Sequence, residues 1–314
     1  MRVLVTGANG FVGQHVLHDL REAGHSVAAL VEKPEHHIEG TTCRDLDITD
    51  ADCVGNAVRD LHPDACIHLA GLAFVPMAWE KPRLALDINV GGTVNLLEAF
   101  RKHARGAHIV VVTSSEVYGR DHGTDQIIDE TTTLAPSNFY GVTKVAADMS
   151  ALSFANKYDM AISTARPQNH IGPGQSDRFV VSSFARQLAD YAKGRTSGTM
   201  KVGNLESERD FTDVRDVARA YRLLMEKGAK GEAFNIASGK NVRIQRMLET
   251  LCKIADTSPA IAVDPEFYRA TDRPALLSTE KIKNFVGWET EYPLDTTLND
   301  IYQDIASRPE SSPT

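Results

Sequence analysis

A glycine-rich segment close to the N-terminus constrains the fold of this chain more than any other part of its sequence. The segment Thr6–Gly13 (TGANGFVG) follows the apolar run Met1–Thr6 and leads into residues 11–23, where apolar side chains recur with helical spacing. Glycine is required where a strand turns sharply into a helix and where backbone approaches a ligand closely. The helix N-terminus offers free N–H groups and a positive dipole end. We therefore expect a strand–turn–helix unit that binds the phosphates of a dinucleotide.

Strand and helix signals alternate through the first half of the chain. Apolar runs that predict strands lie at residues 1–6, 26–31, 65–70, 107–113 and 161–165. Helical spacing is found at residues 11–23, 50–61, 83–104 and 139–158, with Thr49 or Asp50 able to cap the second of these helices. This alternation predicts an α/β fold with a Rossmann-type, doubly wound parallel sheet and right-handed crossovers.

After Arg166 the alternation becomes less regular. Short strands are predicted near residues 199–202 and 233–236, and helices near 179–193, 213–227, 242–254 and 294–306. We expect residues 1–166 to form the dinucleotide-binding domain. Residues 167–307 are then expected to form a smaller α/β substrate domain, with some chain crossing between the two. The polar tail 308–314 (RPESSPT) is expected to be disordered.

Composition excludes several classes of function. The chain has 34 Lys and Arg against 42 Asp and Glu, a net charge of −8, which argues against a general nucleic-acid or anionic-membrane binder. No run approaches the roughly 18 apolar residues of a membrane span. The four cysteines show no CxxC spacing, so we expect no disulfide framework and a cytoplasmic location. The pair His36-His37 has no accompanying ligand spacing, and we expect no metal site.

The choice of cofactor depends on the end of the second strand. An acid there binds the adenosine ribose of NAD, whereas a cation accepts the 2′-phosphate of NADP. This chain has both, Glu32 and Lys33, which could also form only a solvated turn. We expect NADPH or NADH, with NADP slightly preferred. Asp47 and Ile48 would suit the adenine edge, and the segment 69–71 would pass its backbone beneath the ribose and pyrophosphate.

A tyrosine and a lysine near the end of the expected dinucleotide-binding domain predict acid–base chemistry. Tyr140 and Lys144 lie four residues apart, one turn along a helix face. A free tyrosine has a pKa near 10, and a nearby cation favours the phenolate. Ser114 follows the strand 107–113, and the carboxyl ends of parallel strands are where such sheets place their chemistry. Its hydroxyl could bind the oxygen that the tyrosine protonates.

These motifs together resemble the extended short-chain dehydrogenase/reductases over about residues 1–305. That family contains sugar-nucleotide epimerases, dehydratases and reductases. The resemblance implies that Ser114 and Tyr140 contact the sugar O4 and that Lys144 contacts the nicotinamide ribose. The cofactor residues that we infer from the motifs and the resemblance are Gly7, Asn9, Gly10, Phe11, Val12, Gly13, Glu32, Lys33, Asp47, Ile48, Leu69, Ala70, Gly71, Asn89, Thr113, Tyr140, Lys144, Pro167, Asn169 and His170.

Motifs in the second half resemble those of family members that act on GDP-sugars. The segment 166–175 resembles the RPxNxxGP loop, 203–211 resembles GNLxxxRD(W/F), and 269–272 matches a late RxxD. An arginine fork suits a diphosphate, although Arg209 and Arg269 could equally form surface ion pairs. The expected substrate contacts are Ser114, Ser115, Glu116, Asn169, Val180, Lys201, Asn204, Arg209, Arg269 and Asp272.

The resemblance favours reduction of a 4-keto sugar, GDP-4-keto-6-deoxy-D-mannose, to GDP-D-rhamnose. Phe11-Val12 replaces the Gln-Asp usual in GDP-mannose dehydratases, and Ala73 stands where many relatives have a serine. Glu116 leaves a 4,6-dehydratase or 4-epimerase open, because an acid here removes the C5 proton in dehydratases. A regulatory protein that binds a dinucleotide without chemistry is a further alternative, against which the Ser114, Tyr140 and Lys144 set argues.

The resemblance also implies a homodimer. The long predicted helices 83–104 and 139–158 suit the four-helix interface of family members. Their apolar stripes could instead be covered entirely by the core of one chain.

Overall fold

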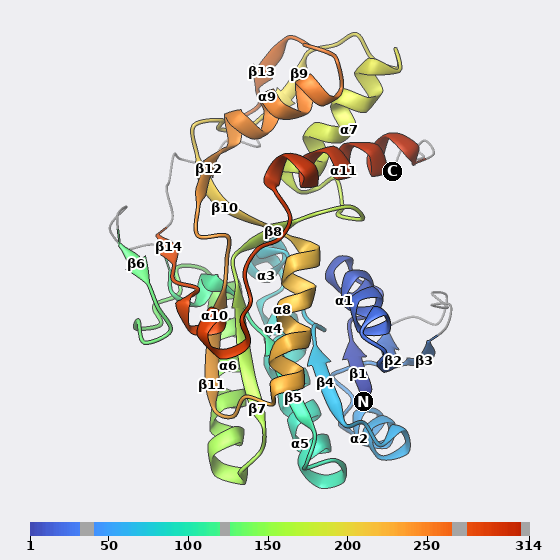
Figure 1. Ribbon diagram of the computed structural model, residues 1–314, viewed down its shortest axis with the longest axis vertical. Coiled ribbons are helices and arrows are strands. Elements are labelled where there is room, and N and C mark those ends of the chain that lie inside the picture. The colour runs from blue at the N-terminus through green and yellow to red at the C-terminus, as the bar shows by residue number, and fades with distance from the viewer. Residues whose placement is uncertain (32–40, 120–125, 266–274, 309–314) are drawn as a thin grey trace.

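A computed structural model gives the fold of the chain (Figure 1). Within the described residues, 1–31, 41–119, 126–265 and 275–308, seven parallel strands form the central sheet. In spatial order they are β11 (Glu232–Ile236), β7 (Ile162–Pro167), β5 (His108–Val112), β4 (Ala65–His68), β1 (Arg2–Thr6), β2 (Ser26–Val31) and β3 (Thr42–Asp45). The strand order reverses between β1 and β4, and sheets of this kind bind ligands beyond the carboxyl ends of the strands at such a point. The predicted α/β fold is confirmed.

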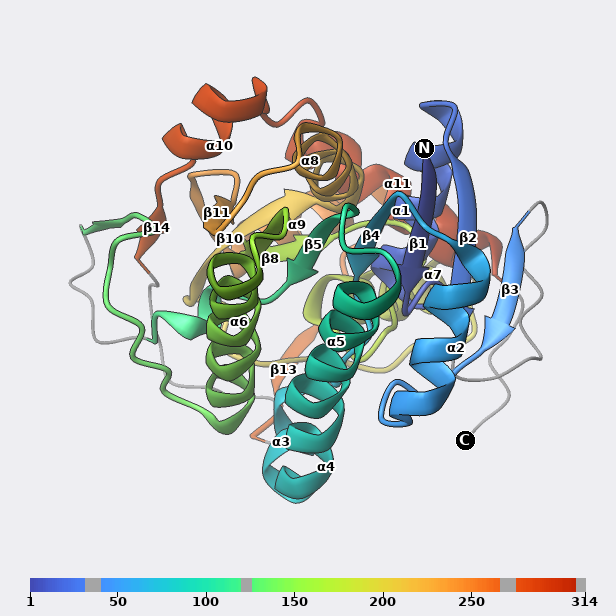
Figure 2. The same ribbon diagram turned by 90° about the horizontal axis from the view of Figure 1, so that it is seen from below.

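Helices cover both faces of the sheet (Figure 2). On one face lie α1 (Phe11–Glu22) and α8 (Val214–Lys227), and on the other lie α2 (Ala51–Leu61), α5 (Thr93–His103) and α6 (Phe139–Tyr158). In β1, Val3 and Val5 belong to the core beneath α1 and α8, whereas Leu4 belongs to the core beneath α2 and α5. Burial on both faces explains why the central residues of the strand, Val3, Leu4 and Val5, are all apolar.

The helix predicted over residues 83–104 is present, with a π-helical turn inside it. The structure has α4 (Pro82–Leu86), a π-helical turn (Asp87–Gly92) and then α5, preceded by the unpredicted α3 (Val75–Glu80). Gly92 packs so closely on Ile48 that a Cβ would lie 2.7 Å from Ile48 Cγ2. Such turns inside helices are frequent at functional sites. The strand predicted over 65–70 ends at His68, and Asp50, not Thr49, caps α2.

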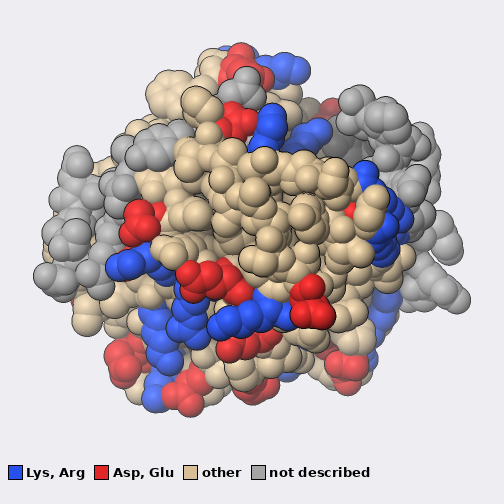
Figure 3. All heavy atoms as spheres, turned by 90° about the horizontal axis from the view of Figure 1, so that it is seen from above, with Lys and Arg blue, Asp and Glu red and all other residues tan. Residues whose placement is uncertain are grey.

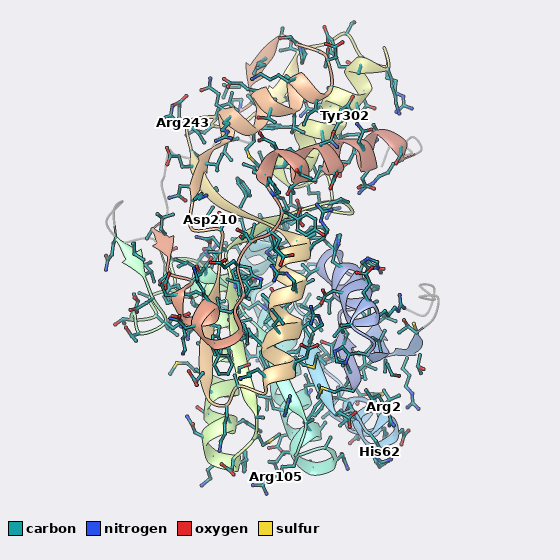
Figure 4. The ribbon with its side chains drawn as sticks, viewed as in Figure 1. Arg2, His62, Arg105, Asp210, Arg243 and Tyr302 are labelled. Carbon is teal, nitrogen blue, oxygen red and sulfur yellow. The ribbon has the colours of Figure 1, made fainter. Side chains whose placement is uncertain are left out.

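A smaller lobe, formed by the second half, stands above the carboxyl ends of the strands (Figure 1). Its core lies between α7 (Val180–Ala192), α9 (Ile244–Ile254) and α11 (Leu294–Ser307). The bounds of these three helices are close to the predicted ones. Strand β9 (Met200–Val202) pairs with β13 (Ile261–Val263). A second small sheet joins β8 (Asn169–Ile171), β10 (Glu208–Asp213) and β12 (Asn241–Arg243). Asp210 of β10 lies between the lobe and the central sheet, whereas Arg2, His62 and Arg105 lie at the far end (Figure 4).

The chain crosses back from the second half to the first. The strand predicted at 233–236 is β11, an edge strand of the central sheet, and α8 packs on α1. Helix α10 (Glu280–Val286) packs on β11, and β14 (Leu276–Leu277) pairs with β6 (Ile127–Ile128). Local periodicity cannot reveal which sheet a short strand joins. The division near residue 166 stays a prediction. Of the tail predicted over 308–314, Arg308 is instead the C-cap of α11 and pairs with Asp304, and residues 309–314 lie outside the described residues.

The surface carries charges of both signs. Seen from the end of the smaller lobe, Lys, Arg, Asp and Glu surround an uncharged centre and are densest along one edge (Figure 3). None of the helices in the described ranges combines the length and apolar character needed to cross a membrane. All four cysteines are free thiols.

Candidate active site

The glycine turn between β1 and α1 forms a cradle that side chains would fill. Gly7 has φ +66°, and a Cβ there would lie 2.9 Å from the backbone nitrogen of Ala70. A Cβ on Gly13 would lie 2.5 Å from the carbonyl oxygen of Gly7. Gly10 is the N-cap of α1, and no side chain among the described residues caps this helix. The free N–H groups of α1 therefore suit the pyrophosphate of a dinucleotide.

A buried histidine links the two strands that flank this cradle. Thr6 Oγ1 lies 2.7 Å from His68 Nδ1, and His68 Nε2 lies 3.1 Å from Thr93 Oγ1. Because Thr93 donates its own proton to the Asn89 carbonyl, we infer that His68 carries its proton on Nε2 and accepts from Thr6. Burial, with a smaller contribution from Lys144, lowers the pKa of His68 to about 3. His68 is therefore neutral.

Asn89 ties the π-helical turn to its surroundings. Its Oδ1 accepts from the backbone N–H of Leu72 at 2.7 Å, and its Nδ2 donates to Thr143 Oγ1 at 2.8 Å. The hydroxyl of Thr143 in turn donates to the carbonyl oxygen of Tyr140. A Cβ on Gly71 would lie 3.0 Å from Asn89 Oδ1, so the backbone of the 69–71 segment passes directly beside this amide.

The structure brings Ser114, Tyr140 and Lys144 together at the carboxyl end of β5. The Tyr140 side chain lies close enough to Ser114 to interact with it, and Lys144 Nζ donates to the Val112 carbonyl at 3.1 Å. Burial raises the pKa of Tyr140 to about 12; the interaction with the Ser114 side chain opposes this rise and the charge of Glu116 adds to it. Burial also lowers the pKa of Lys144 to about 8. The pKa of Tyr140 is therefore raised, not lowered as the nearby lysine led us to expect, and a phenol and an ammonium group coexist here at neutral pH.

Glu116 lies beside this cluster in the single turn Ser115–Val117. Asn138, the N-cap of α6, donates from Nδ2 to Glu116 Oε2 at 2.5 Å and accepts from the Gly141 N–H at 2.8 Å. One asparagine therefore positions both the glutamate and the helix that carries Tyr140. Ser115, in contrast, donates to the side chain of Gln168.

Phe11 joins the glycine turn to β8 and the segment around it. Its ring stacks on His170 with a centroid distance of 6.1 Å and an interplanar angle of 10°. His15 Nε2 donates to the Pro173 carbonyl at 2.8 Å. Burial lowers the pKa of both histidines. Pro167, the last residue of β7, leads into this segment, so these predicted cofactor residues lie together.

The predicted substrate residues are more widely spread. Asn169 and Arg209 lie on the paired strands β8 and β10, and Asn169 Nδ2 donates to the Asp210 carbonyl at 3.4 Å. Asn204 Oδ1 accepts from the Glu206 N–H, and Lys201 forms an ion pair with Asp264 at 3.2 Å. Val180 begins α7 and is 38% exposed. The remaining predicted residues Glu32, Lys33, Arg269 and Asp272 lie outside the described residues, as do His36 and His37.

The predicted adenine-edge residues have structural partners of their own. Asp47 Oδ1 accepts from both the N–H and the hydroxyl of Thr49, which closes the turn before α2. Ile48 is buried and accepts from Asn95 Nδ2 through its carbonyl oxygen. Among the described residues, no group of three or more His, Cys, Asp or Glu side chains is arranged to hold a metal ion.

Contacts of Asn138 and Gln168 with the site were not predicted from the sequence. Asn138 had a usable signal, because an asparagine immediately before a helix is a preferred N-cap. Gln168 had none, since its side chain meets Ser115 only through the pairing of β7 with β5.

The doubly wound sheet, the glycine turn and the Ser114, Tyr140 and Lys144 cluster define an extended short-chain dehydrogenase/reductase. The profile of the GDP-mannose 4,6 dehydratase family matches residues 4–301. The chain belongs to this family and is an NAD(P)-dependent enzyme.

Known relatives and solved structures match this chain over nearly its whole length. A GDP-6-deoxy-D-mannose reductase from Pseudomonas aeruginosa is 36% identical over 308 residues, 98% of each chain. The structure of RMD from Pseudomonas aeruginosa complexed with NADPH has a TM-score of 0.86 at 34% identity, covering 98% of this chain and 99% of that one. The UDP-glucose 4-epimerase of Thermus thermophilus, in complex with NAD, has a TM-score of 0.85 at 26% identity with the same coverage. The cofactor is a nicotinamide dinucleotide.

Proposed function

We propose that this enzyme reduces the C4 ketone of a nucleotide-linked sugar, specifically GDP-4-keto-6-deoxy-D-mannose to GDP-D-rhamnose. The observation that carries the proposal is the juxtaposition of Ser114 and Tyr140 at the carboxyl end of β5, with Lys144 Nζ 5.9 Å from the centre of the Tyr140 ring. The relative named GDP-6-deoxy-D-mannose reductase and the solved structure that holds NADPH support this choice of substrate and of NADPH over NADH.

The protonation states of these side chains suit reduction at neutral pH. The dinucleotide, when bound, supplies hydride to C4. Tyr140, whose pKa is about 12, holds the proton that O4 must receive, as a general acid requires. Ser114 donates a hydrogen bond to the same oxygen. Lys144, with a pKa of about 8, is an ammonium group at pH 7 and stabilises the phenolate that remains.

The second lobe is proposed to hold the GDP moiety. Asn169 and Arg209 lie on adjacent strands, which suits contacts with the sugar and the diphosphate, and we assign Arg269 and Asp272 to the diphosphate and nucleoside ribose. We also propose a cytoplasmic homodimer. Helix α6 exposes Val142 and Met149, at 42% and 58%, beside α5, which suits an interface with a second copy.

A 4,6-dehydratase or 4-epimerase is the second candidate. It is favoured by Glu116, whose carboxylate is held by Asn138 and lies near enough to Tyr140 to raise its pKa. Such an enzyme would oxidise C4 transiently and regenerate its cofactor, whereas a reductase consumes one NADPH for each product.

Absorbance at 340 nm separates the two candidates. Purified protein, NADPH and freshly generated GDP-4-keto-6-deoxymannose should lose absorbance in proportion to the product formed. An active substrate stock with no loss of absorbance would contradict the reductase proposal. Conversion of GDP-mannose without consumption of cofactor would then favour the dehydratase.

A further inference from the structure

A buried ion pair between α6 and β7 lies directly behind the catalytic cluster. Arg166 Nε donates to Asp148 Oδ2 at 3.0 Å, and Arg166 Nη2 donates to Asp148 Oδ1 at 2.7 Å. The two side chains are only 4% and 0% exposed. Removing such charges from water costs about as much free energy as their attraction returns, so stability is a weak reason for burying them.

The ion pair contacts the residue that immediately precedes Ser114. Asp148 lies one turn beyond Lys144 on α6, and its Oδ2 accepts from Thr113 Oγ1 at 3.0 Å. Thr113 immediately precedes Ser114. The carboxylate therefore fastens the end of β5 to the helix that carries Tyr140 and Lys144.

The same ion pair also contacts Tyr118, which follows Ser114 and Glu116 in the chain. Arg166 Nη1 donates to the hydroxyl of Tyr118 at 2.9 Å, and Tyr118 donates to Asn235 Oδ1 at 2.7 Å. Tyr118 directly follows the turn Ser115–Val117, which carries Glu116. The residues from Ser114 to Glu116 are thus held at both ends by one ion pair.

We propose that Arg166 and Asp148 are positioning residues that fix the hydroxyl of Ser114 against the hydroxyl of Tyr140. The inference rests on the proposed function, because it takes these two hydroxyls as the groups that meet O4. Neither charged group is placed to touch the sugar, so their effect is on geometry. A displacement of about 1 Å at a reacting centre can cost about 100-fold in rate.

The test replaces both charges together, because removing one partner leaves a buried charge that destabilises the whole fold. The double variant Asp148→Leu with Arg166→Met replaces both charged groups by apolar side chains and loses the pair. We expect a kcat about 10- to 100-fold lower, with the KM for the sugar and the affinity for NADPH within about threefold of wild type. A merely structural pair would alter the melting temperature and leave kcat per folded molecule unchanged.

A matched control breaks another ion pair between elements. Asp19 of α1 and Arg222 of α8 are joined at 2.7 Å on the opposite face of the sheet from α6. The double variant Asp19→Leu with Arg222→Met should retain the wild-type kcat. If the Asp148 and Arg166 double variant does not fold, Thr113→Val removes the hydroxyl that lies within hydrogen-bond distance of Asp148 Oδ2 and of the Ala165 carbonyl, and its kcat should fall about threefold or more.

A crystal structure of the variant gives a readout that needs no substrate. A larger separation of the Ser114 and Tyr140 hydroxyls than in a crystal structure of the wild-type protein supports the inference. An unchanged separation overturns it, as does a wild-type kcat in the folded variant. If the wild-type protein converts neither the 4-keto sugar nor GDP-mannose, the proposed function fails, and the distance between the two hydroxyls alone decides the inference.

Discussion

Lys144 Nζ lies 5.9 Å from the centre of the Tyr140 ring, one turn along the same helix. Burial acts on the two groups in opposite directions, raising the pKa of Tyr140 to about 12 and lowering that of Lys144 to about 8. Below pH 8 the pair therefore consists of a protonated acid and a cation beside it. Both states suit donation of a proton to a ketone oxygen.

Replacing Tyr140 by phenylalanine should abolish reduction. The variant keeps the ring but loses the proton that O4 receives, so kcat should fall about 100- to 10,000-fold. Binding of NADPH, followed by its fluorescence, should stay near normal. Tyr158→Phe at the other end of α6 is the matched control and should be fully active. A wild-type rate in Tyr140→Phe would refute the assignment.

Activity should decline as the pH rises through about 8. Lys144 is an ammonium group below its pKa and a neutral amine above it, so the support for the phenolate is lost on the alkaline side. The profile of kcat/KM for NADPH reports the free enzyme and should show this limb. The Lys144→Met variant should be slow throughout and lack the limb. A wild-type profile that stays flat to pH 9 would contradict the prediction.

Replacing Met149 by glutamate should weaken the proposed dimer. Met149 is 58% exposed on α6, and a carboxylate there would have to be desolvated against a second copy. Light scattering should give twice the chain mass for wild type and a lower, concentration-dependent mass for Met149→Glu. Tyr292→Glu, an aromatic residue 38% exposed in the segment before α11, is a suitable control. A wild-type protein that is monomeric at all concentrations would exclude the interface.

The sequence was sufficient where one local pattern determines one element. The glycine turn, the Tyr140 and Lys144 spacing and the long α6 were all predicted, because each depends on residues within a few turns. The position of β11 at the edge of the central sheet and the contact of Arg166 with Tyr118 depend on the pairing of distant strands. Likewise, the partners of His68 follow from the meeting of β1, β4 and the start of α5, which no spacing reveals.

His68 should make the fold sensitive to acid. Its pKa is about 3 in the folded protein against 6.5 as the ordinary value, so between these limits the unfolded chain binds a proton that the native state does not. Stability therefore falls as the pH drops from 6.5 towards 3, by up to about 1.4 kcal/mol per pH unit.

The His68→Asn variant should be less stable than wild type at pH 7, because a buried hydrogen bond is lost. It should also lose stability less steeply between pH 6 and pH 4, as measured by denaturant unfolding at each pH. His18→Asn, at an exposed position of α1, controls for the loss of a surface histidine. Equal slopes for wild type and His68→Asn would show that His68 is not the group responsible.

Replacing Gly13 by alanine should impair both the fold and cofactor binding. The added Cβ would meet the carbonyl oxygens of Gly7 and Ala8, each at 2.5 Å, and backbone cannot move aside as a flexible side chain can. Gly55→Ala is a matched control, because Gly55 is also helical and its Cβ would meet no atom within 4 Å. The control should gain about 0.5–1 kcal/mol of stability and bind NADPH normally. Gly13→Ala should melt at a lower temperature and bind NADPH at least about tenfold more weakly, because α1 must shift away from β1. Equal melting temperatures and NADPH affinities for the two variants would show that the turn has room for a side chain and that the close packing of α1 on β1 does not determine cofactor binding.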